Sequence, residues 1–483
     1  MQERNFVQAG DTIGHAITAL QFMERELLLF ATFWFIIGAL DDLAIDVCWL
    51  WLRLTGRSPA LGISRAEVAG RLEGRIAVLI AAWQEGAVIG HTIRHALGAW
   101  PQPELTLYLG CYRNDPGTIA AAMAAAGNDP RLRIVIHERA GPTTKADCLN
   151  RLYRALAEDE RRTDQRFRTV VIHDAEDMVH PAELAVIDRA IGSAGLVQLP
   201  VRPEPQPRSP WIGGHYCEEF TEAHAKLLVV RDALRVPVPA AGVGCGIARD
   251  LLDLLAARRL REGEGDGGPF STTCLTEDYE LGYLVWREGR RTRFIRVRDE
   301  DGELVATRAY FPASLEAAVR QKARWIHGIA FQEWERLGWG TRLADLWMTL
   351  RDRREPFSAL VLASGYVLVL VELLLALARL AQIDIPPRPS PALQVMLGIC
   401  AGALVWRAAA RFAFTTHEYG PGEGLRALLR IPVANVIAII AGRRALATYV
   451  RTLLGETVRW DKTEHTRHPA ADGLAMLPSG GAR

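Results

Sequence analysis

The sequence predicts an α/β domain with a mostly parallel, Rossmann-like sheet that is inserted between transmembrane helices. Hydrophobic residues make up 49% of the 483-residue chain, and long apolar runs are concentrated toward both flanks. Between these runs, short β-rich segments alternate with helical stretches, which is the pattern of successive βαβ units. A chain of this length exceeds one ordinary domain and can form a large core together with additional segments.

Charge and cysteine content exclude several classes of protein. The formal net charge is +1, so the chain has no overall basic field and we expect no nucleic-acid partner. The seven cysteines contain no C-x-x-C pair. An odd number without this spacing argues against a disulfide framework or a zinc cluster and fits a reducing compartment. We expect no cleavable signal at the N-terminus, because polar and acidic residues follow Arg4.

The first apolar run, residues 27–52, is long enough to cross a bilayer as a helix. Three acids interrupt it, Asp41, Asp42 and Asp46. Charges at membrane depth are costly, so these side chains should face protein, water or a cationic partner. The alternative is that the helix leaves the membrane early and that the acids lie at the interface.

Two further transmembrane helices are expected at 356–381 and 392–412, on either side of a short proline-rich loop. The apolar stretch 431–441 lies between arginines and is too short to span a bilayer. We therefore expect residues 413–456 to form interfacial or re-entrant helices.

Basic residues predict the orientation of these helices. Arginines follow the first span, precede the second and follow the third: Arg53, Arg57, Arg65, Arg71 and Arg75; Arg351, Arg353 and Arg354; and Arg407, Arg411, Arg426 and Arg430. By the positive-inside rule, residues 53–355 and the tail 457–483 should face the cytoplasm. The slightly acidic tail 1–26 should then be periplasmic, and three spans satisfy this arrangement.

The middle of the chain is predicted to form the sheet. Strands are expected over 75–83, 104–112, 131–138 and 167–177, with helices between them. In such sheets, ligands collect at the carboxyl ends of the strands. The residues there are unusually polar: Gln84, Glu85, Asn114, Asp115, Asp174, Glu176 and Asp177. Because unpaired buried carboxylates are expensive, this group suits a divalent cation and a polar nucleotide. The alternative is a solvated loop with helix-capping acids.

Three features are expected downstream of these strands. Residues 198–201 are predicted as another strand, and a helix should cover approximately 218–230. The glycine cluster 242–250 should form a tight turn that lets the backbone approach a ligand or another strand.

Four short motifs carry the chemistry. Residues 174–177 (DAED) close a strand, and residues 276–278 (TED) open a helix. Residues 321–325 read QKARW, and Lys145 and Asn150 lie on the helix after the third strand. Together these motifs resemble the D-x-D, TED, Q-x-x-R-W and lysine-asparagine motifs of the inverting membrane glycosyltransferases of family 2, which include cellulose, hyaluronan and chitin synthases.

The resemblance covers nearly the whole chain, including 462–465 (KTEH). It implies a GT-A glycosyltransferase domain over 53–355, with interface helices near 315–340, at the bacterial inner membrane. The activity it implies is inverting, metal-dependent transfer from a UDP-sugar, with UDP-N-acetylhexosamine as a candidate, to a growing glycan in processive exopolysaccharide synthesis.

Two alternatives remain open. The first is a single transfer to polyprenyl phosphate or another lipid acceptor. The second is a non-catalytic envelope scaffold or phage-receptor component, against which the intact motifs argue. Three spans make a self-contained polymer channel small, which favours a homo-oligomer, an outer-membrane or export partner, or the single transfer.

The resemblance also assigns roles to individual residues. Asp278 would be the general base that accepts the proton of the attacking hydroxyl. Mg²⁺ or Mn²⁺ would neutralise the diphosphate, and its ligand would be Glu176, which replaces the family's second aspartate, or the adjacent Asp177. The donor nucleotide would contact Ala82, Glu85, Asp115, Lys145 and Asp174. The acceptor and the diphosphate would contact Gln321, Arg324, Trp325 and Glu277.

Two of these motifs also have structural interpretations. Gln321, Arg324 and Trp325 share one helix face, which offers a stacking ring for a sugar and a cation for a diphosphate. The same helix could lie on the membrane, anchored by Trp325 and Trp334, and both roles are compatible. Thr276 could cap the helix that follows it, with Asp278 still free to act in catalysis.

Overall fold

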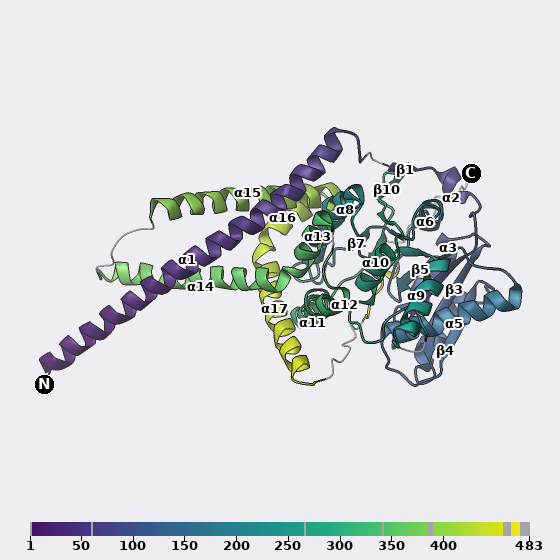
Figure 1. Cartoon of the computed structure of the whole chain (residues 1–483), viewed down its shortest axis with the longest axis horizontal. Helices are drawn as coiled ribbons and strands as arrows, with labels where there is room; N and C mark the ends of the chain where they lie inside the picture. The colour runs from purple at the N-terminus through teal and green to yellow at the C-terminus, as the bar shows by residue number, and fades with distance from the viewer. Residues whose placement is uncertain are drawn as a thin grey trace.

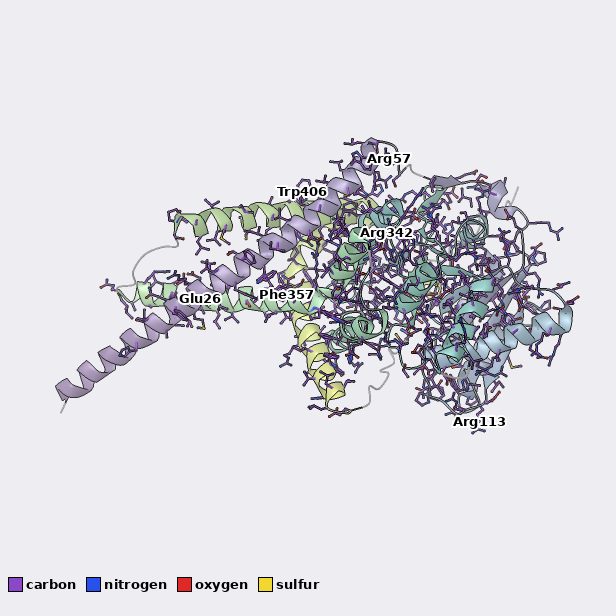
Figure 2. The ribbon with its side chains drawn as sticks, in the orientation of Figure 1. Glu26, Arg57, Arg113, Arg342, Phe357 and Trp406 are labelled. Atoms are coloured by element: carbon purple, nitrogen blue, oxygen red, sulfur yellow. The ribbon has the colours of Figure 1, made fainter. Side chains whose placement is uncertain are left out.

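The computed structural model describes residues 2–58, 61–264, 267–340, 342–383, 390–456 and 465–473. It has two parts, an α/β domain and a group of long helices that extend away from one side of that domain (Figure 1). The side chains of these parts are shown in the same orientation in Figure 2, where Arg113 marks the far edge of the α/β domain and Glu26 lies on the long first helix.

A seven-stranded sheet forms the centre of the α/β domain, in the order β4-β3-β2-β5-β8-β6-β9. The first four strands in this order are parallel, whereas β8 is antiparallel to both of its neighbours. The strands are β2 (Ile76–Ala81), β3 (Leu105–Tyr112), β4 (Leu132–His137), β5 (Thr169–Asp174), β6 (Leu196–Gln198), β8 (Cys245–Ala248) and β9 (Thr292–Phe294). The predicted Rossmann-like, GT-A-type domain is confirmed.

Helices on both faces explain why the central strands read as continuous apolar runs. Every residue of β3 is buried. The sheet is covered and extended by α2 (Arg65–Ala69), α3 (Ile89–Ala99), α4 (Pro116–Ala126), α5 (Lys145–Thr163), α6 (Glu183–Ile191), α9 (Arg249–Arg261) and α10 (Glu277–Arg287). Of these, α5 packs on β2, β3 and β4, and α6 and α9 pack on β8.

The structure differs from the sequence expectations in two places downstream of β5. The glycine cluster begins with the expected tight turn, in which Gly242 and Gly244 have positive φ, but it continues directly into β8, a strand that the sequence analysis did not predict. The predicted strand 198–201 is instead the junction between β6 and β7 (Val201–Pro203). The predicted helix 218–230 is confirmed, since α7 (His215–Glu222) continues through a wide π-helical turn (Ala223–Leu227) into α8 (Leu228–Leu234).

Two short parallel strand pairs connect the sheet to the other elements. One joins β1 (Leu61–Ile63) to β10 (Val297–Asp299), and the other joins β7 to β11 (Thr307–Ala309). Three helices then lead toward the membrane segments: α11 (Leu315–Ile326), α12 (Glu333–Leu337) and α13 (Leu343–Arg353).

Four helices in the described residues are long and apolar enough to cross a membrane, judged by length and composition. They are Ile17–Leu54 within α1 (Gln2–Leu54), α14 (Glu355–Leu380), α15 (Pro391–Tyr419) and α17 (Ile431–Leu453). The three expected spans therefore fall on α1, α14 and α15. Because α1 begins at Gln2, the expected tail 1–26 is mostly a continuation of the first helix.

The region 413–456 differs from its prediction in length. After α15 and α16 (Pro421–Leu429), the apolar stretch 431–441 is the first half of the 23-residue helix α17, so it is not too short to span a membrane. The helix α17 nevertheless differs in direction from the other long helices, because it runs across α14 and α15 rather than along them (Figure 1). It packs against α11, where Ala441 and Ala445 contact Ala323 and Ile326.

The three acids of α1 have cationic partners. Asp42 lies 2.6 Å from Arg351 and 2.8 Å from Arg354, and it also contacts Arg407. Asp46 Oδ1 lies 2.5 Å from Lys226 Nζ. Asp41 contacts Arg351 and Arg354 as well. The expectation that these carboxylates face cationic partners is confirmed, and the pairs join α1 to α13, α15 and the wide turn before α8.

Candidate active site

A cavity of about 340 Å³ opens at the carboxyl ends of β2 and β5. The start of α5, the turn before β8, the start of α10 and one face of α11 complete its wall. Eleven of the twelve residues that the sequence analysis selected line this cavity: Ala82, Glu85, Lys145, Asp174, Glu176, Asp177, Glu277, Asp278, Gln321, Arg324 and Trp325. The fold therefore brings motifs from distant parts of the sequence to one place.

Lys145 provides the positive charge of the cavity. It is the first residue of α5, and the Thr144 side chain caps this helix by accepting a hydrogen bond from a backbone N–H. The Lys145 ammonium lies 2.5 Å from Asp174 Oδ1 and donates a hydrogen bond to the Gly242 carbonyl. Burial would lower the pKa of Lys145, but Asp174, Glu277 and Asp278 outweigh burial and raise this pKa, so the amine is protonated.

Asp278 lies in the first turn of α10 and lines the same cavity as Asp174 and Glu176. Burial raises its pKa above the ordinary aspartate value, although Lys145 opposes this effect. Gly242 makes room for the carboxylate, since a Cβ atom at this position would lie 2.6 Å from Asp278 Oδ2. The tight turn that the sequence predicted thus lets the backbone approach an acidic side chain.

Thr276 occupies the N-cap position of α10, but its side chain makes no capping hydrogen bond. The expectation that this hydroxyl caps the helix is wrong, because Gly328 lies against it: a Cβ atom there would lie 2.4 Å from Thr276 Oγ1. The hydroxyl is buried and has no hydrogen-bond partner among the residues that the structure describes. It lines the cavity, where a ligand could satisfy it.

Glu176 and Asp177 have different surroundings. Asp177 is 1% exposed and accepts hydrogen bonds from His173 and from the Asp174 backbone N–H. The other ring nitrogen of His173 lies 2.6 Å from Glu183. Burial would lower the pKa of His173, but Glu183 and Asp177 outweigh burial and raise this pKa to about 10. Asp177 is therefore committed to a buried ion network, whereas Glu176 faces the cavity.

His465 is a site residue that the sequence analysis did not select, although the KTEH motif contains it; Lys462 to Glu464 lie outside the described residues. Its ring nitrogens lie 3.2 Å from Glu85 Oε1 and 3.1 Å from Glu176 Oε1. One potential ligand atom from each of Glu85, Glu176 and His465 lies within 4.8 Å of the others. Burial would lower the pKa of His465, but Glu176 and Glu85 outweigh it and raise the pKa to about 9.

Gln321, Arg324 and Trp325 project from α11 into the cavity, as their spacing predicted. The Trp325 ring packs near Tyr216 and Phe220, at centroid distances of 6.4 and 6.3 Å. The Gln321 Oε1 atom is buried and makes no hydrogen bond with any part of the chain that the structure describes. This face therefore offers a ring edge and an unused acceptor atom to a ligand.

Asp115, the twelfth selected residue, and Asn150 of the lysine-asparagine motif do not line the cavity but hold segments that do. Asp115 does not line the cavity; it caps α4 and accepts a hydrogen bond of 2.6 Å from the Gln84 backbone N–H, so it holds the loop that carries Glu85. Asn150 exchanges two hydrogen bonds with the Phe270 backbone, at 2.8 and 3.0 Å, and fixes the segment that leads into α10.

Comparison with known proteins identifies the family of this chain. Residues 74–328 match the family described as glycosyltransferase like family 2. Two curated relatives are similar over most of the chain: bacteriophage adsorption protein B of Escherichia coli (strain K12) and bacteriophage N4 adsorption protein B of Escherichia coli O157:H7. Each is 33% identical to this chain over 459 residues, which is 89% of this chain and 60% of the relative.

A solved structure gives a more distant similarity. The mannosyltransferase PcManGT from Pyrobaculum calidifontis, in complex with GDP-Man and Mn²⁺, aligns with 17% identity and a TM-score of 0.47. The alignment covers 86% of this chain and 99% of the mannosyltransferase.

Proposed function

Because this chain belongs to glycosyltransferase like family 2, we propose that it moves a sugar, with inversion, from a UDP-sugar to an acceptor at a membrane surface. The observation that carries the proposal is the composition of the single cavity described above. Lys145 Nζ lies 2.5 Å from Asp174 Oδ1, and a Cβ atom at Gly242 would lie 3.3 Å from this ammonium and 2.6 Å from Asp278 Oδ2, so one cation lies near the acids of both motifs. We assign Asp278 to the acceptor and Asp174 with Glu176 to the donor.

Asp278 acts as the general base in this proposal. A base must lie within hydrogen-bond reach of the attacking hydroxyl, and its pKa must exceed that of an ordinary carboxyl group to accept the proton efficiently. Burial raises the pKa of Asp278 in this direction. Lys145, which is protonated, keeps the carboxylate ionised and offers positive charge to the donor diphosphate.

A divalent cation fits the donor side. Glu85, Glu176 and His465 provide two carboxylates and one imidazole within 4.8 Å of one another. Such a mixed oxygen and nitrogen set suits Mn²⁺, whereas Mg²⁺ prefers oxygen ligands alone. When bound, the cation would neutralise charge on the leaving diphosphate. We assign Glu176 rather than Asp177 to this site, because Asp177 is held by His173.

The acceptor would reach the cavity along α11. Its Gln321, Arg324 and Trp325 line the cavity, while its opposite side packs on α17. Since α17 in turn packs on α14, the acceptor side of the site is continuous with the membrane helices. This arrangement, together with the Q-x-x-R-W motif, favours extension of a glycan at the inner membrane, with the catalytic domain on the cytoplasmic side.

The chain spans 60% of the length of the curated relatives that it matches. An export partner, a homo-oligomer and a role in an envelope complex are therefore proposals about the full-length system.

Release of UDP from the protein in detergent tests the transfer. A panel of UDP-sugars, including UDP-N-acetylhexosamines, is incubated with Mn²⁺ or Mg²⁺. GDP-sugars serve as the control for the nucleobase of the donor. We expect UDP release with at least one UDP-sugar. The rate of this release should fall about 10²- to 10⁴-fold in Asp278→Asn. Equal release by the wild type and Asp278→Asn with every active donor would contradict the assignment of the base.

The size of the product separates processive synthesis from a single transfer. Labelled donor is added with a glycan primer or with polyprenyl phosphate, and the products are resolved by length. A ladder or a long polymer supports extension of a glycan. Only a monoglycosylated lipid supports the alternative of a single transfer.

A further inference from the structure

A second cavity, larger than the active site, lies where the catalytic domain meets the membrane helices. Its volume is about 1160 Å³, and it shares no lining residue with the active-site cavity in the part of the chain that the structure describes. Four parts of the fold form its walls: the end of α1, the second half of α15, α8 with the turn before it, and the segment around β9 and β10.

One half of this cavity is apolar. Its wall includes Leu43, Val47 and Trp49 of α1 and Trp406 and Phe414 of α15. The rings of Trp49 and Phe414 meet edge to face, with centroids 5.2 Å apart. Both helices are candidate membrane spans by length and composition.

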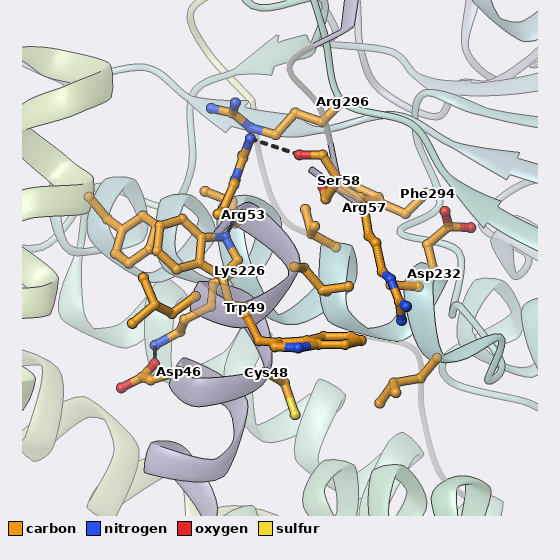
Figure 3. Close-up of a pocket in the computed structure, with 18 of the residues that line it drawn as sticks. Asp46, Cys48, Trp49, Arg53, Arg57, Ser58, Lys226, Asp232, Phe294 and Arg296 are labelled. Atoms are coloured by element: carbon orange, nitrogen blue, oxygen red, sulfur yellow. Dashed lines mark hydrogen bonds and ion pairs between the residues drawn. The ribbon is translucent and has the colours of Figure 1, made fainter. Parts of the chain in front are cut away.

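The other half is strongly cationic. Eight lysine and arginine side chains line the cavity, against two carboxylates, Asp46 and Asp232. Figure 3 shows Arg53 and Arg296 close together at one end, whereas the Arg57 side chain points away from them. Lys226 is already paired with Asp46, and Arg293 with Asp232. The excess of positive charge therefore falls on the arginines near Arg53.

The partners of these arginines satisfy only part of their capacity. The Arg53 Nε atom is buried and has no hydrogen-bond partner among the described residues; its Nη1 donates only to the Ser58 carbonyl. Arg57 lies over the Trp51 ring, 4.4 Å from its centroid. Glu418 serves both Arg296 and Arg298. Burial lowers the pKa of Arg296, and Arg298 and Arg53 lower it further against the effect of Glu418.

We propose that this cavity binds an anionic phospholipid of the membrane, with its acyl chain between α1 and α15 and its phosphate at Arg53 and Arg296. A phosphate supplies oxygen acceptors to guanidinium donors in the geometry that arginine favours. A soluble anion would use only the cationic half, whereas a phospholipid uses both halves. The aromatic rings at the junction match the preference of tryptophan for the membrane interface.

The proposed lipid would connect parts that are separate in the sequence. Arg53 belongs to the first helix, Phe414 to α15, and Arg296 to the segment between β9 and β10. One bound molecule would therefore fasten the catalytic domain to two membrane helices. This role is independent of the sugar that the active site transfers.

Native mass spectrometry of the whole chain in detergent tests the proposal. Phosphatidylglycerol is titrated against phosphatidylcholine with the same acyl chains, and glycerol 3-phosphate tests the headgroup alone. We expect one phosphatidylglycerol to be retained more tightly than phosphatidylcholine, with no competition from glycerol 3-phosphate at matched concentration. Arg53→Gln with Arg296→Gln should weaken this binding about five-fold for each arginine removed.

Two further variants make the test specific. Ala413→Phe fills the apolar half without changing charge, because Ala413 lines the cavity, and it should weaken binding of both lipids. Arg443→Gln with Arg451→Gln removes two exposed cations from α17 and should leave binding unchanged. If the double arginine variant lowers Tm sharply, Arg53→Gln alone should still weaken phosphatidylglycerol binding about five-fold and leave phosphatidylcholine binding unchanged.

Three outcomes would overturn the proposal. One is equal affinity for the two lipids in the wild type. Another is unchanged phosphatidylglycerol binding in both the arginine and the Ala413 variants. The third is displacement of the lipid by glycerol 3-phosphate at a similar concentration, which would identify a site for soluble anions.

Discussion

Glu176 Oε1 lies 3.1 Å from His465 Nε2, although the two residues come from distant parts of the chain. Glu176 follows a central strand of the sheet, whereas His465 lies beyond the last membrane helix. The described segment 465–473 therefore contacts the α/β domain at the candidate active site. This contact adds His465 to the residues of that site.

We predict that His465→Ala weakens the use of the divalent cation. His465 supplies one of three closely spaced ligand atoms, and loss of one ligand should raise the Mn²⁺ concentration for half-maximal activity by roughly 10- to 100-fold. The measurement is UDP release over a Mn²⁺ titration. The exposed His15 provides the control, because His15→Ala should follow the wild-type curve. If the two variants show the same Mn²⁺ dependence, His465 is not a ligand.

The sequence predicted the sheet and the motifs because these depend on local patterns. The strand before DAED, the turn at Gly242 and the common face of Gln321 and Trp325 all follow from periodicity and residue type. The contact of His465 with Glu176 could not be predicted in this way, since it depends on the path of the chain after α17. Sequence periodicity also failed for β8, whose four residues directly follow a glycine turn.

We predict opposite effects for two adjacent acids. Glu176→Gln should abolish metal-dependent transfer with little change in Tm, because Glu176 faces the cavity. Asp177→Asn should instead lower Tm, since it removes a buried partner of His173. Breaking a buried ion network in this way costs roughly 3–5 kcal/mol. Thermal unfolding and UDP release, measured on both variants, provide the comparison.

The two variants serve as controls for each other, because they differ by one position and carry the same change of charge. A large loss of Tm in Glu176→Gln would show that its carboxylate is structural. A stable Asp177→Asn without activity would move the metal ligand back to Asp177.

We predict that Gly242→Ala inactivates the enzyme by displacing Asp278. The new Cβ would lie 2.6 Å from Asp278 Oδ2 and 3.3 Å from Lys145 Nζ, so the base and its cation must both move. We expect a loss of activity of about 100-fold or more, because small displacements of catalytic groups have effects of this size. The measurement is kcat for UDP release.

Gly263→Ala is the matched control for this substitution. Gly263 has nearly the same φ, +73° against +74°, but no atom lies within 4 Å of its Cβ position. Both variants should lose a similar amount of stability, about 1–2 kcal/mol, from the left-handed backbone. If Gly263→Ala loses as much activity as Gly242→Ala, backbone strain rather than contact with Asp278 is the cause.

The membrane pattern was predictable in part, for a similar reason. The expectation that the acids of α1 have cationic partners follows from the cost of an unpaired charge, and Asp42 with Arg351 and Arg354 satisfies it. The length of α17 was missed because Arg443 and Arg444 end its apolar run, while the helix itself continues. A helix boundary and a hydrophobic boundary are different properties of the chain.

The last prediction concerns pH. A general base must be ionised, so kcat/KM should fall as the pH decreases through the pKa of Asp278. Burial raises this pKa above the ordinary value of about 3.9 for aspartate, and the fall should therefore begin at a higher pH than for an exposed aspartate.

Lys145 opposes the rise in the pKa of Asp278. Removing its charge in Lys145→Met should thus move the acid limb to higher pH, whereas Lys145→Arg should keep it near the wild-type position. Lower activity in both variants is expected, because Lys145 also faces the donor, so the informative quantity is the position of the limb in a pH profile of kcat/KM. If Lys145→Met lowers activity and leaves the limb in place, the titrating group is not Asp278.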